Sequence, residues 1–463
     1  MRHSPKAIAY LVPFLTALAT HAGPSDATAC TGFRTGVEGR FIMGKSYDWD
    51  IGWALVVFNP IGLEKIALTL GGQDTPATWT SQHASITFDQ YGCEMPNGGL
   101  NDAGLAIELM ILGQTQYPPS DDRPAVNELQ FIQYCLDNFG SVDEMIEGAA
   151  LIRISPVHAK VHYLACDSTG ICASFEFLGG QMVVATKDSM PAATLTNSTY
   201  ADSVEYLGQF VGFGGDLAIP QTTSSLDRFV RASSLSVETA DGEIPTAAFS
   251  ILDSVSQGDF SQWNIVYDLE ERTIHFRTYT SPARKVIRLD QFNPGCDSGR
   301  WILDIDHSEA GDARSAFVPY TKEANAALID KSLSTIQGLP DYVKAVLALY
   351  PDSLECVPPV VQPEAQPDTD APDGAGDDLV AVDDMGCSPE ADSDALPADL
   401  PPGAADGQLL DGPASESSTD GPDSVPSKGG CSAGASSAAP SGWLGFVLLL
   451  LAYRICRRFA QSR

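Results

Sequence analysis

Cys30 is the residue best placed to do chemistry, because of what stands directly before it. Residues 27–29 read ATA, an A-x-A pattern typical of cleavage after an export signal. Cleavage there leaves Cys30 as the first residue, with a free α-amine whose ordinary pKa is about 7.7 to 8. Such an amine can take the proton of the neighbouring thiol, so one residue supplies both nucleophile and base. Activity is therefore expected only after processing.

The first 29 residues have the pattern of a removable signal peptide. Arg2 and Lys6 precede an apolar run at 7–19, which is shorter than the ~20 residues needed to span a bilayer. Lipidation of Cys30 is the alternative, but Ala27 stands where a lipoprotein signal usually has Leu. We therefore predict a signal peptide over 1–29 and a free Cys30.

The other end of the chain differs in composition from the middle. Residues 361–430 contain seventeen Asp or Glu and one basic residue, Lys428, among many Pro, Gly, Ala and Ser. Too few large apolar side chains are present to offset chain entropy, and like charges repel. The composition predicts a disordered acidic stalk over 356–430, following a folded domain over 30–355.

The last segment, 431–463, begins with Cys431 and has an apolar run at 442–453 followed by a basic cluster that includes Arg454. This arrangement resembles MYXO-CTERM surface-sorting tails, and the resemblance implies processing near Cys431. An ordinary single-pass transmembrane anchor is the alternative. Both interpretations predict an exported protein at the cell surface, in the periplasm or outside the cell, attached to a membrane or the surface through this tail.

Charge and cysteine spacing limit the partners. The formal net charge of −33 argues against a nucleic-acid partner. The spacing of Cys and His matches no zinc site, and there is no Gly-rich phosphate loop, so we expect neither metal nor cofactor. Residues 166–172 read CDSTGIC, where Cys166 and Cys172 can pair across a hairpin or remain unpaired.

The middle of the chain alternates short strand-like and longer helix-like segments. Helical periodicity is clearest at 125–139, 141–150, 225–235 and 246–255, with further helical periods at 313–350. Strands meeting mostly through hairpins, with helices between groups of them, predict antiparallel sheets covered by helices, an α+β fold class. The expected strands lie at 31–37, 40–44, 54–59, 65–70, 84–88, 105–112, 160–166, 171–178, 182–185, 263–269 and 273–279.

Five motifs stand in order along this region. They are Cys30-Thr31, GKSYDW at 44–49, GGLNDAGLA at 98–106, LTNS at 195–198 and SSLDRFVR at 224–231. Together they resemble the motifs of choloylglycine hydrolases and penicillin V acylases, which are N-terminal nucleophile hydrolases of linear amides. The resemblance covers about residues 30–280. It implies a four-layer αββα sandwich with two antiparallel sheets between helical layers.

The resemblance also assigns roles to individual residues. Cys30 is expected to be the nucleophile and, through its amine, the base; Asp48 holds that amine by a charge-assisted hydrogen bond. Asn197 matches the side-chain donor to the tetrahedral oxyanion. Arg228 matches the guanidinium beside the nucleophile, where it favours thiolate over thiol.

Two positions depart from the family pattern. Lys45 replaces the family's Arg and loses its planar fork. The Asn or Tyr that usually completes the oxyanion hole is absent from residues 108–114, where Glu108 and Gln114 stand instead. We assign Lys45, Glu108 and Gln114 to substrate binding. The same departures leave open a surface binding module that has the fold and does not turn over substrate.

The resemblance implies hydrolysis of a linear N-acyl amide through a thioester, without a metal or cofactor. We rank a general N-acyl amidase first, a penicillin V acylase second and a bile-salt hydrolase third, with an acyl-homoserine lactone as a further substrate candidate. The partner is thus a small-molecule N-acyl amide. The sequence does not predict an oligomeric state.

Overall fold

The computed structural model describes residues 30–357 except 38, 70–73, 157–158, 238–243 and 337–340. The predicted signal peptide and C-terminal tail lie outside the described residues, as does the predicted stalk except for Cys356 and Val357. No helix among the described residues is long and apolar enough to cross a membrane.

Two large sheets form the centre of the fold. Sheet A has the order β14-β1-β2-β15-β16-β17-β19, and sheet B has the order β13-β12-β11-β8-β7-β6-β3-β18-β20. Neighbouring strands are antiparallel in both sheets except for the parallel pair β17 and β19. The strands of sheet A are β1 (Thr31–Val37), β2 (Arg40–Asp48), β14 (Thr194–Leu195), β15 (Ser261–Asp268), β16 (Thr273–Thr278), β17 (Lys285–Arg288) and β19 (Gly311–Asp312).

Sheet B consists of β3 (Leu55–Asn59), β6 (Ser85–Asp89), β7 (Pro96–Asn101), β8 (Ala106–Ile111), β11 (Val161–Cys166), β12 (Cys172–Leu178), β13 (Gln181–Thr186), β18 (Trp301–Asp304) and β20 (Val318–Pro319). Two small sheets flank it, β9 (Ala125–Val126) with β10 (Arg153–Ile154), and β4 (Leu63–Ile66) with β5 (Thr78–Thr80) and β21 (Glu355–Cys356).

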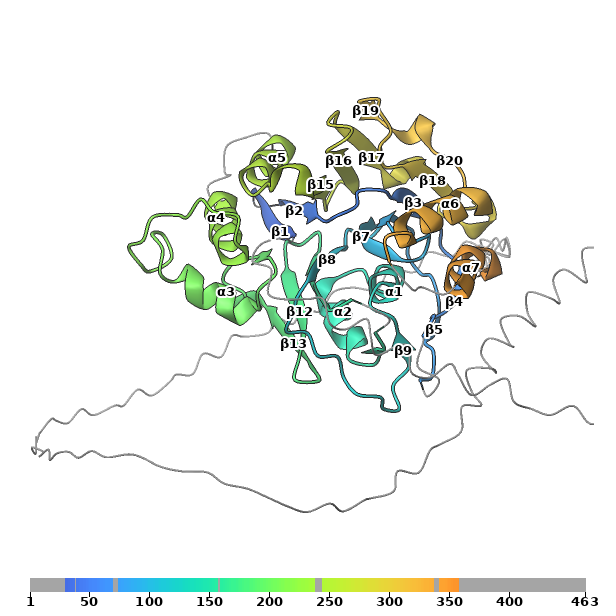
Figure 1. Ribbon diagram of the computed structural model, residues 1–463, viewed down its shortest axis with the longest axis horizontal. Helices are drawn as coiled ribbons and strands as arrows, with labels where there is room; N and C mark the ends of the chain where they lie inside the picture. The colour runs from blue at the N-terminus through green and yellow to red at the C-terminus, as the bar shows by residue number, and fades with distance from the viewer. Residues whose placement is uncertain are drawn as a thin grey trace, which may run out of the picture. The chain divides into compact units, whose positions relative to one another are not determined.

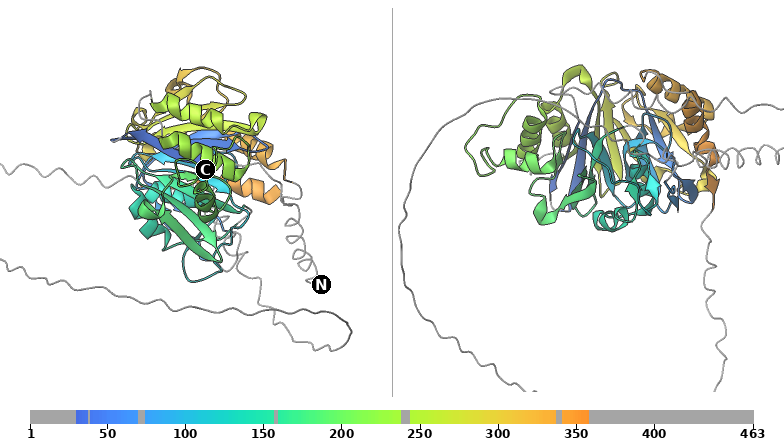
Figure 2. Two further views of the ribbon diagram at one scale, coloured as in Figure 1. Left: turned by 90° about the vertical axis from the view of Figure 1, so that its left-hand side faces the viewer. Right: turned by 60° about the horizontal axis from the view of Figure 1, so that its bottom comes forward.

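Helices cover the outer faces of both sheets. Figures 1 and 2 show α4 (Ser225–Val237) and α5 (Ile244–Ser254) beside sheet A, and α1 (Gln130–Asn138) and α2 (Val142–Ala149) beside sheet B. α3 (Tyr200–Leu207) packs on α4, and α6 (Lys322–Leu333) packs on α7 (Asp341–Leu349).

Strand alternation in β2 shows how the layers are filled. Ile42 packs with Phe249 of α5, whereas the next residue, Met43, lies in the core between the sheets with Met110 of β8. Successive side chains of a strand point to opposite faces, so one strand serves two cores. A third core lies between sheet B and α1 with α2. The αββα sandwich expected from the sequence is confirmed.

Several local predictions differ from the structure. The strand expected at 65–70 is β4, which ends at Ile66, and the strand expected at 40–44 continues to Asp48. The helix expected at 125–139 begins only at Gln130, because Ala125 and Val126 pair with β10 and the Asn127 side chain accepts from the backbone N–H of Gln130 at 2.8 Å. β7 was not among the expected strands. A Cβ on Gly98 would collide with the carboxyl group of Glu108 on the neighbouring strand, so any larger residue there would displace that buried side chain.

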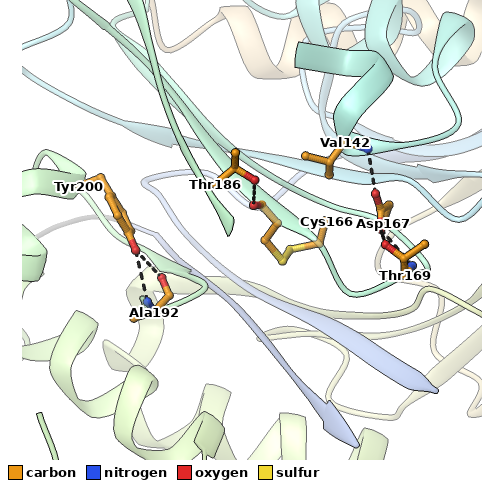
Figure 3. The surroundings of a disulfide bond; sticks show 8 residues. Val142, Cys166, Asp167, Thr169, Thr186, Ala192 and Tyr200 are labelled. Atoms are coloured by element: carbon orange, nitrogen blue, oxygen red, sulfur yellow. Dashed lines mark hydrogen bonds between the residues drawn. A yellow bond between two sulfur atoms is a disulfide. The ribbon is translucent and has the colours of Figure 1, made fainter. Parts of the chain in front are cut away.

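Two disulfides join described residues. Cys166 and Cys172 pair across the β11–β12 hairpin, which settles the alternative left open by the sequence (Figure 3). Cys296 pairs with Cys356, one residue past the predicted domain boundary at 355. The backbone N–H of Val357 donates to Gly62 at 2.8 Å, so this last described segment is fixed to the sandwich.

Candidate active site

Cys30 lies at the start of β1, in the core between the two sheets. The residue is 2% exposed, and its Sγ is 4.0 Å from the carbonyl oxygen of Asp48. Thr31 pairs with Ser46 in the antiparallel β1–β2 ladder, and this register places Cys30 beside the end of β2. The chain thus brings together two residues that are eighteen positions apart in the sequence.

Arg228 connects the outer helix α4 to this point. Its Nη1 donates to the carbonyl oxygen of Cys30 at 2.7 Å and to Thr31 Oγ1 at 2.6 Å, and its Nη2 donates to Asn197 Oδ1 at 3.1 Å. Its Nε donates to the carbonyl oxygen of Thr223 at 3.0 Å. The guanidinium is fully buried, so its planar set of donors holds the nucleophile and Asn197 in one arrangement.

Asn197 lies just after β14, within reach of both sheets. Its Nδ2 donates to the carbonyl oxygen of Ile111 in β8 at 2.8 Å, and its backbone N–H donates to Ser225 Oγ at 2.9 Å. A primary amide has two N–H donors, and Ile111 takes one of them. The second N–H remains available to donate to another acceptor.

Asp48 is buried and held by three donors. Ser46 Oγ and Ser261 Oγ donate to its Oδ1, and Gln257 Nε2 donates to its Oδ2 at 2.8 Å. Burial raises the pKa of this carboxyl group, while the bond from Ser261 and the positive charge of Arg228 oppose the increase. A cation brought close to a buried carboxylate favours its charged form.

Lys45 and Glu108 form an ion pair between the sheets, Nζ to Oε2 3.6 Å, with both side chains buried. Lys45 Nζ also donates to the carbonyl oxygen of Leu109, and Tyr267 OH donates to Glu108 Oε1. Burial raises the pKa of Glu108 to about 7, against the opposing effects of Lys45 and Tyr267. The two residues therefore bind each other, and their assignment to substrate binding stays a prediction.

Burial also raises the pKa of the Cys30 thiol, and the charge of Lys45 is the largest influence in the opposite direction. A thiol in these surroundings stays protonated unless a base removes its proton. Ionisation of this thiol would therefore need a base close to Sγ.

The structure brings six of the seven predicted residues to this region and leaves one outside. Gln114 is exposed in the turn after β8, and no hydrogen bond joins its side chain to a site residue within the described part of the chain. The sequence assigned no role to the residues that support the others. Thr31, Ser46 and Ser225 lie within the quoted motifs, whereas Gln257 and Ser261 lie outside them. Only the folded structure shows which side chains these five residues contact.

No protein-family model matches this chain. A curated penicillin V acylase from Pectobacterium atrosepticum is 28% identical over 211 residues, which are 42% of this chain. This chain is homologous to penicillin V acylase. The match spans only 54% of that acylase's length.

Solved structures agree on the fold. Penicillin V acylase from Agrobacterium tumefaciens aligns with a TM-score of 0.57 and 24% identity, covering 63% of this chain and 98% of the acylase. A variant of the conjugated bile acid hydrolase from Clostridium perfringens aligns with a TM-score of 0.51 and 18% identity, covering 61% of this chain and 98% of the hydrolase. The sandwich is thus the fold of these hydrolases.

Proposed function

We propose that this protein is an exported amidase whose nucleophile is Cys30 and whose substrate is a linear N-acyl amide. The observation that carries the proposal is the position of Arg228, which binds the backbone carbonyl of Cys30 and the side chain of Asn197 at once. Nucleophile and oxyanion donor are thereby held next to each other, with Asp48 on the third side. Homology to penicillin V acylase supports the same reaction class.

The reaction takes place in two steps. The free α-amine of Cys30 takes the thiol proton, and Sγ attacks the acyl carbon of the amide. Asn197 Nδ2 donates to the oxyanion that forms. The tetrahedral intermediate then breaks its C–N bond, and the α-ammonium returns its proton to the leaving amine, which leaves a thioester on Sγ.

Water hydrolyses the thioester in the second step. The α-amine takes a proton from the attacking water, the new C–O bond forms, and the C–S bond breaks. The proton passes to Sγ, so the enzyme ends as it began and the acyl group leaves as a carboxylic acid. Asp48 keeps the amine in place throughout both steps.

We also propose that cleavage after residue 29 switches the enzyme on and that 431–463 attaches it to a membrane or the cell surface. The uncleaved nitrogen is an amide and cannot act as the base. Two disulfides among the described residues support export, since disulfides persist in oxidising compartments.

The names of the relatives guide the choice of substrates. They are penicillin V acylases and a conjugated bile acid hydrolase, all of which act on amides. We rank simple N-acyl amides first, penicillin V second and bile-salt conjugates third. An N-acyl-homoserine lactone completes the set.

The experiment compares the processed wild-type protein with a Cys30→Ala variant on these four substrates, following release of the amine. The proposal predicts hydrolysis of at least one substrate by the wild type and none by the variant. Equal turnover by both proteins, or saturable binding without turnover by a wild type that begins at Cys30, would reject the amidase. The second result would establish a binding module on the same fold.

A further inference from the structure

His162 lies in β11 with its ring fully buried between the sheets, and the proposed reaction steps do not use it. Its Nε2 is 2.7 Å from the carbonyl oxygen of Thr196, and its Nδ1 is 3.0 Å from Glu176 Oε1. A carbonyl oxygen only accepts hydrogen bonds, so Nε2 carries a proton. Nδ1 and the carboxyl oxygen share a second proton, since two lone pairs at this distance would repel.

Glu176 fixes the other end of this contact. The same oxygen, Oε1, accepts from the backbone N–H of Tyr200 at 2.9 Å, where α3 begins. Glu176 is 3% exposed and lies in β12, next to β11. The imidazole therefore cannot rotate without breaking two buried hydrogen bonds. A buried polar group left without its partner lowers the stability of the fold.

Thr196 is the residue directly before the proposed oxyanion donor. We call residues 196–198 the oxyanion segment. The segment leaves sheet A at the end of β14 and meets sheet B at two adjacent strands, where Ile111 of β8 accepts from Asn197 and His162 of β11 donates to Thr196. On the side of α4, Ser225 Oγ accepts a hydrogen bond from the backbone N–H of Asn197 at 2.9 Å.

The contacts from sheet B therefore control where the Asn197 side chain points. Ile111 fixes the amide group itself, and His162 fixes the backbone one residue earlier. We propose that His162 and Glu176 are positioning residues for catalysis, which hold Thr196 so that the free N–H of Asn197 stays directed at the oxyanion. This inference rests on the proposed function, because it needs Asn197 to be the oxyanion donor.

The proposal predicts a change in kcat rather than in substrate binding. A donor displaced by about 1 Å can lose a hundredfold in rate. His162→Phe keeps the ring and removes both hydrogen bonds, and Glu176→Gln keeps the side-chain shape and removes the shared proton. We expect each to lower kcat about tenfold to a hundredfold and to change KM by about twofold or less.

The decisive measurement is a double-mutant cycle with Asn197→Ala, on the best substrate of the wild type. If His162 acts through Asn197, then His162→Phe changes kcat by less than about twofold in the Asn197→Ala background. His83→Phe is the matched control, because His83 also pairs with a carboxylate, Asp102 at 2.8 Å, and contacts no site residue in the described chain. The control should retain wild-type kcat.

The outcomes distinguish failure of the positioning role of His162 from failure of the proposed amidase function. Wild-type turnover with unchanged kcat in both His162→Phe and Glu176→Gln would overturn the positioning role and leave the amidase in place. Additive losses in the cycle would also overturn it, since they would show a general structural effect. Should His162→Phe not fold, Glu176→Gln carries the same cycle. A wild type that begins at Cys30 and hydrolyses no substrate would instead reject the proposed function.

Discussion

Arg228 donates a hydrogen bond of 2.7 Å to the carbonyl oxygen of Cys30, across 198 positions of sequence. The contact joins the outer helix α4 to the residue that directly precedes the inner strand β1. Because the carbonyl lies on the same residue as the proposed nucleophile and base, this bond fixes the backbone from which both groups extend. Burial lowers the pKa of Arg228, and the nearby Asp48 carboxylate opposes that shift most strongly.

Arg228→Lys should therefore impair the reaction although the charge is kept. A lysine presents one ammonium group where the guanidinium reaches Cys30, Thr31 and Asn197 with separate N–H donors. We expect kcat to fall about a hundredfold or more, because both nucleophile and oxyanion donor lose their support. Steady-state kinetics checks this, with Arg288→Lys, an exposed arginine, as control. Wild-type kcat in Arg228→Lys would contradict the role given to the guanidinium.

Breaking the buried ion pair should affect both folding and the thiol. Lys45→Met leaves Glu108 without its cation, and removing one partner of a buried pair costs about 3 to 5 kcal/mol. The loss should be smaller in Lys45→Met/Glu108→Gln, which removes both charges. Chemical denaturation measures these differences, and equal stabilities for the single and double variants would disprove the pairing.

The same Lys45→Met variant should react more slowly with iodoacetamide at Cys30. Lys45 is the largest influence that lowers the pKa of this buried thiol, so its removal should shift the pH profile of alkylation to higher pH. An unchanged pH profile of alkylation would show that the charge of Lys45 does not influence the pKa of the Cys30 thiol.

Asp89 should make the protein more stable in mild acid than at neutral pH. Burial raises its pKa from 3.8 to about 7, and its Oδ1 has no hydrogen-bond partner in the described structure. Between these values the folded state keeps a proton that the unfolded chain has released, so stability falls as pH rises from about 4 to about 7. Glu108 contributes in the same direction.

Asp89→Asn cannot titrate, so its Tm should depend less on pH across that interval. Thermal unfolding at several pH values tests this, with Asp290→Asn as an exposed control. If the Tm of the wild type and the Tm of Asp89→Asn changed by the same amount between pH 4 and pH 7, the raised pKa of Asp89 would be contradicted.

The two disulfides should differ in their contribution to stability. They close loops with sequence separations of 60 and 6 residues. In the chain-entropy model a longer loop gains more, about 4 kcal/mol for Cys296–Cys356 and about 2 for Cys166–Cys172. Replacing each pair by alanines and measuring the free energy of unfolding checks the order. A larger loss from the Cys166–Cys172 pair would reverse it.

Much of this fold could be predicted because period-two and helical patterns are local. The limits of β1 agree with the expected strand at 31–37. The helix expected at 141–150 is α2, where the Ser141 side chain accepts from the backbone N–H of Glu144. β7 could not be predicted from propensity, because a Cβ on Gly98 would meet the Glu108 side chain and a Cβ on Gly99 would meet the backbone carbonyl of Ile86. Such a reason exists only in the folded chain.

For the site as well, the residues in sequence motifs could be predicted, but their contacts across the fold could not. Motif order indicated Cys30, Asp48, Asn197 and Arg228, and these residues lie together. The partners of Lys45 and Glu108 could not be predicted, since their pairing depends on how two sheets face each other. The contact of His162 with Thr196 could not be predicted either, since no sequence spacing connects the two residues.

The measurement that tests the central claim most directly is intact-mass and N-terminal analysis of the exported protein, with and without iodoacetamide. We predict a mature chain that begins at Cys30, with a free α-amine and a thiol that is alkylated once the chain is processed. A chain beginning at Gly23, or a lipid-modified Cys30, would contradict the mechanism, because the base would then be absent from the nucleophile's own residue.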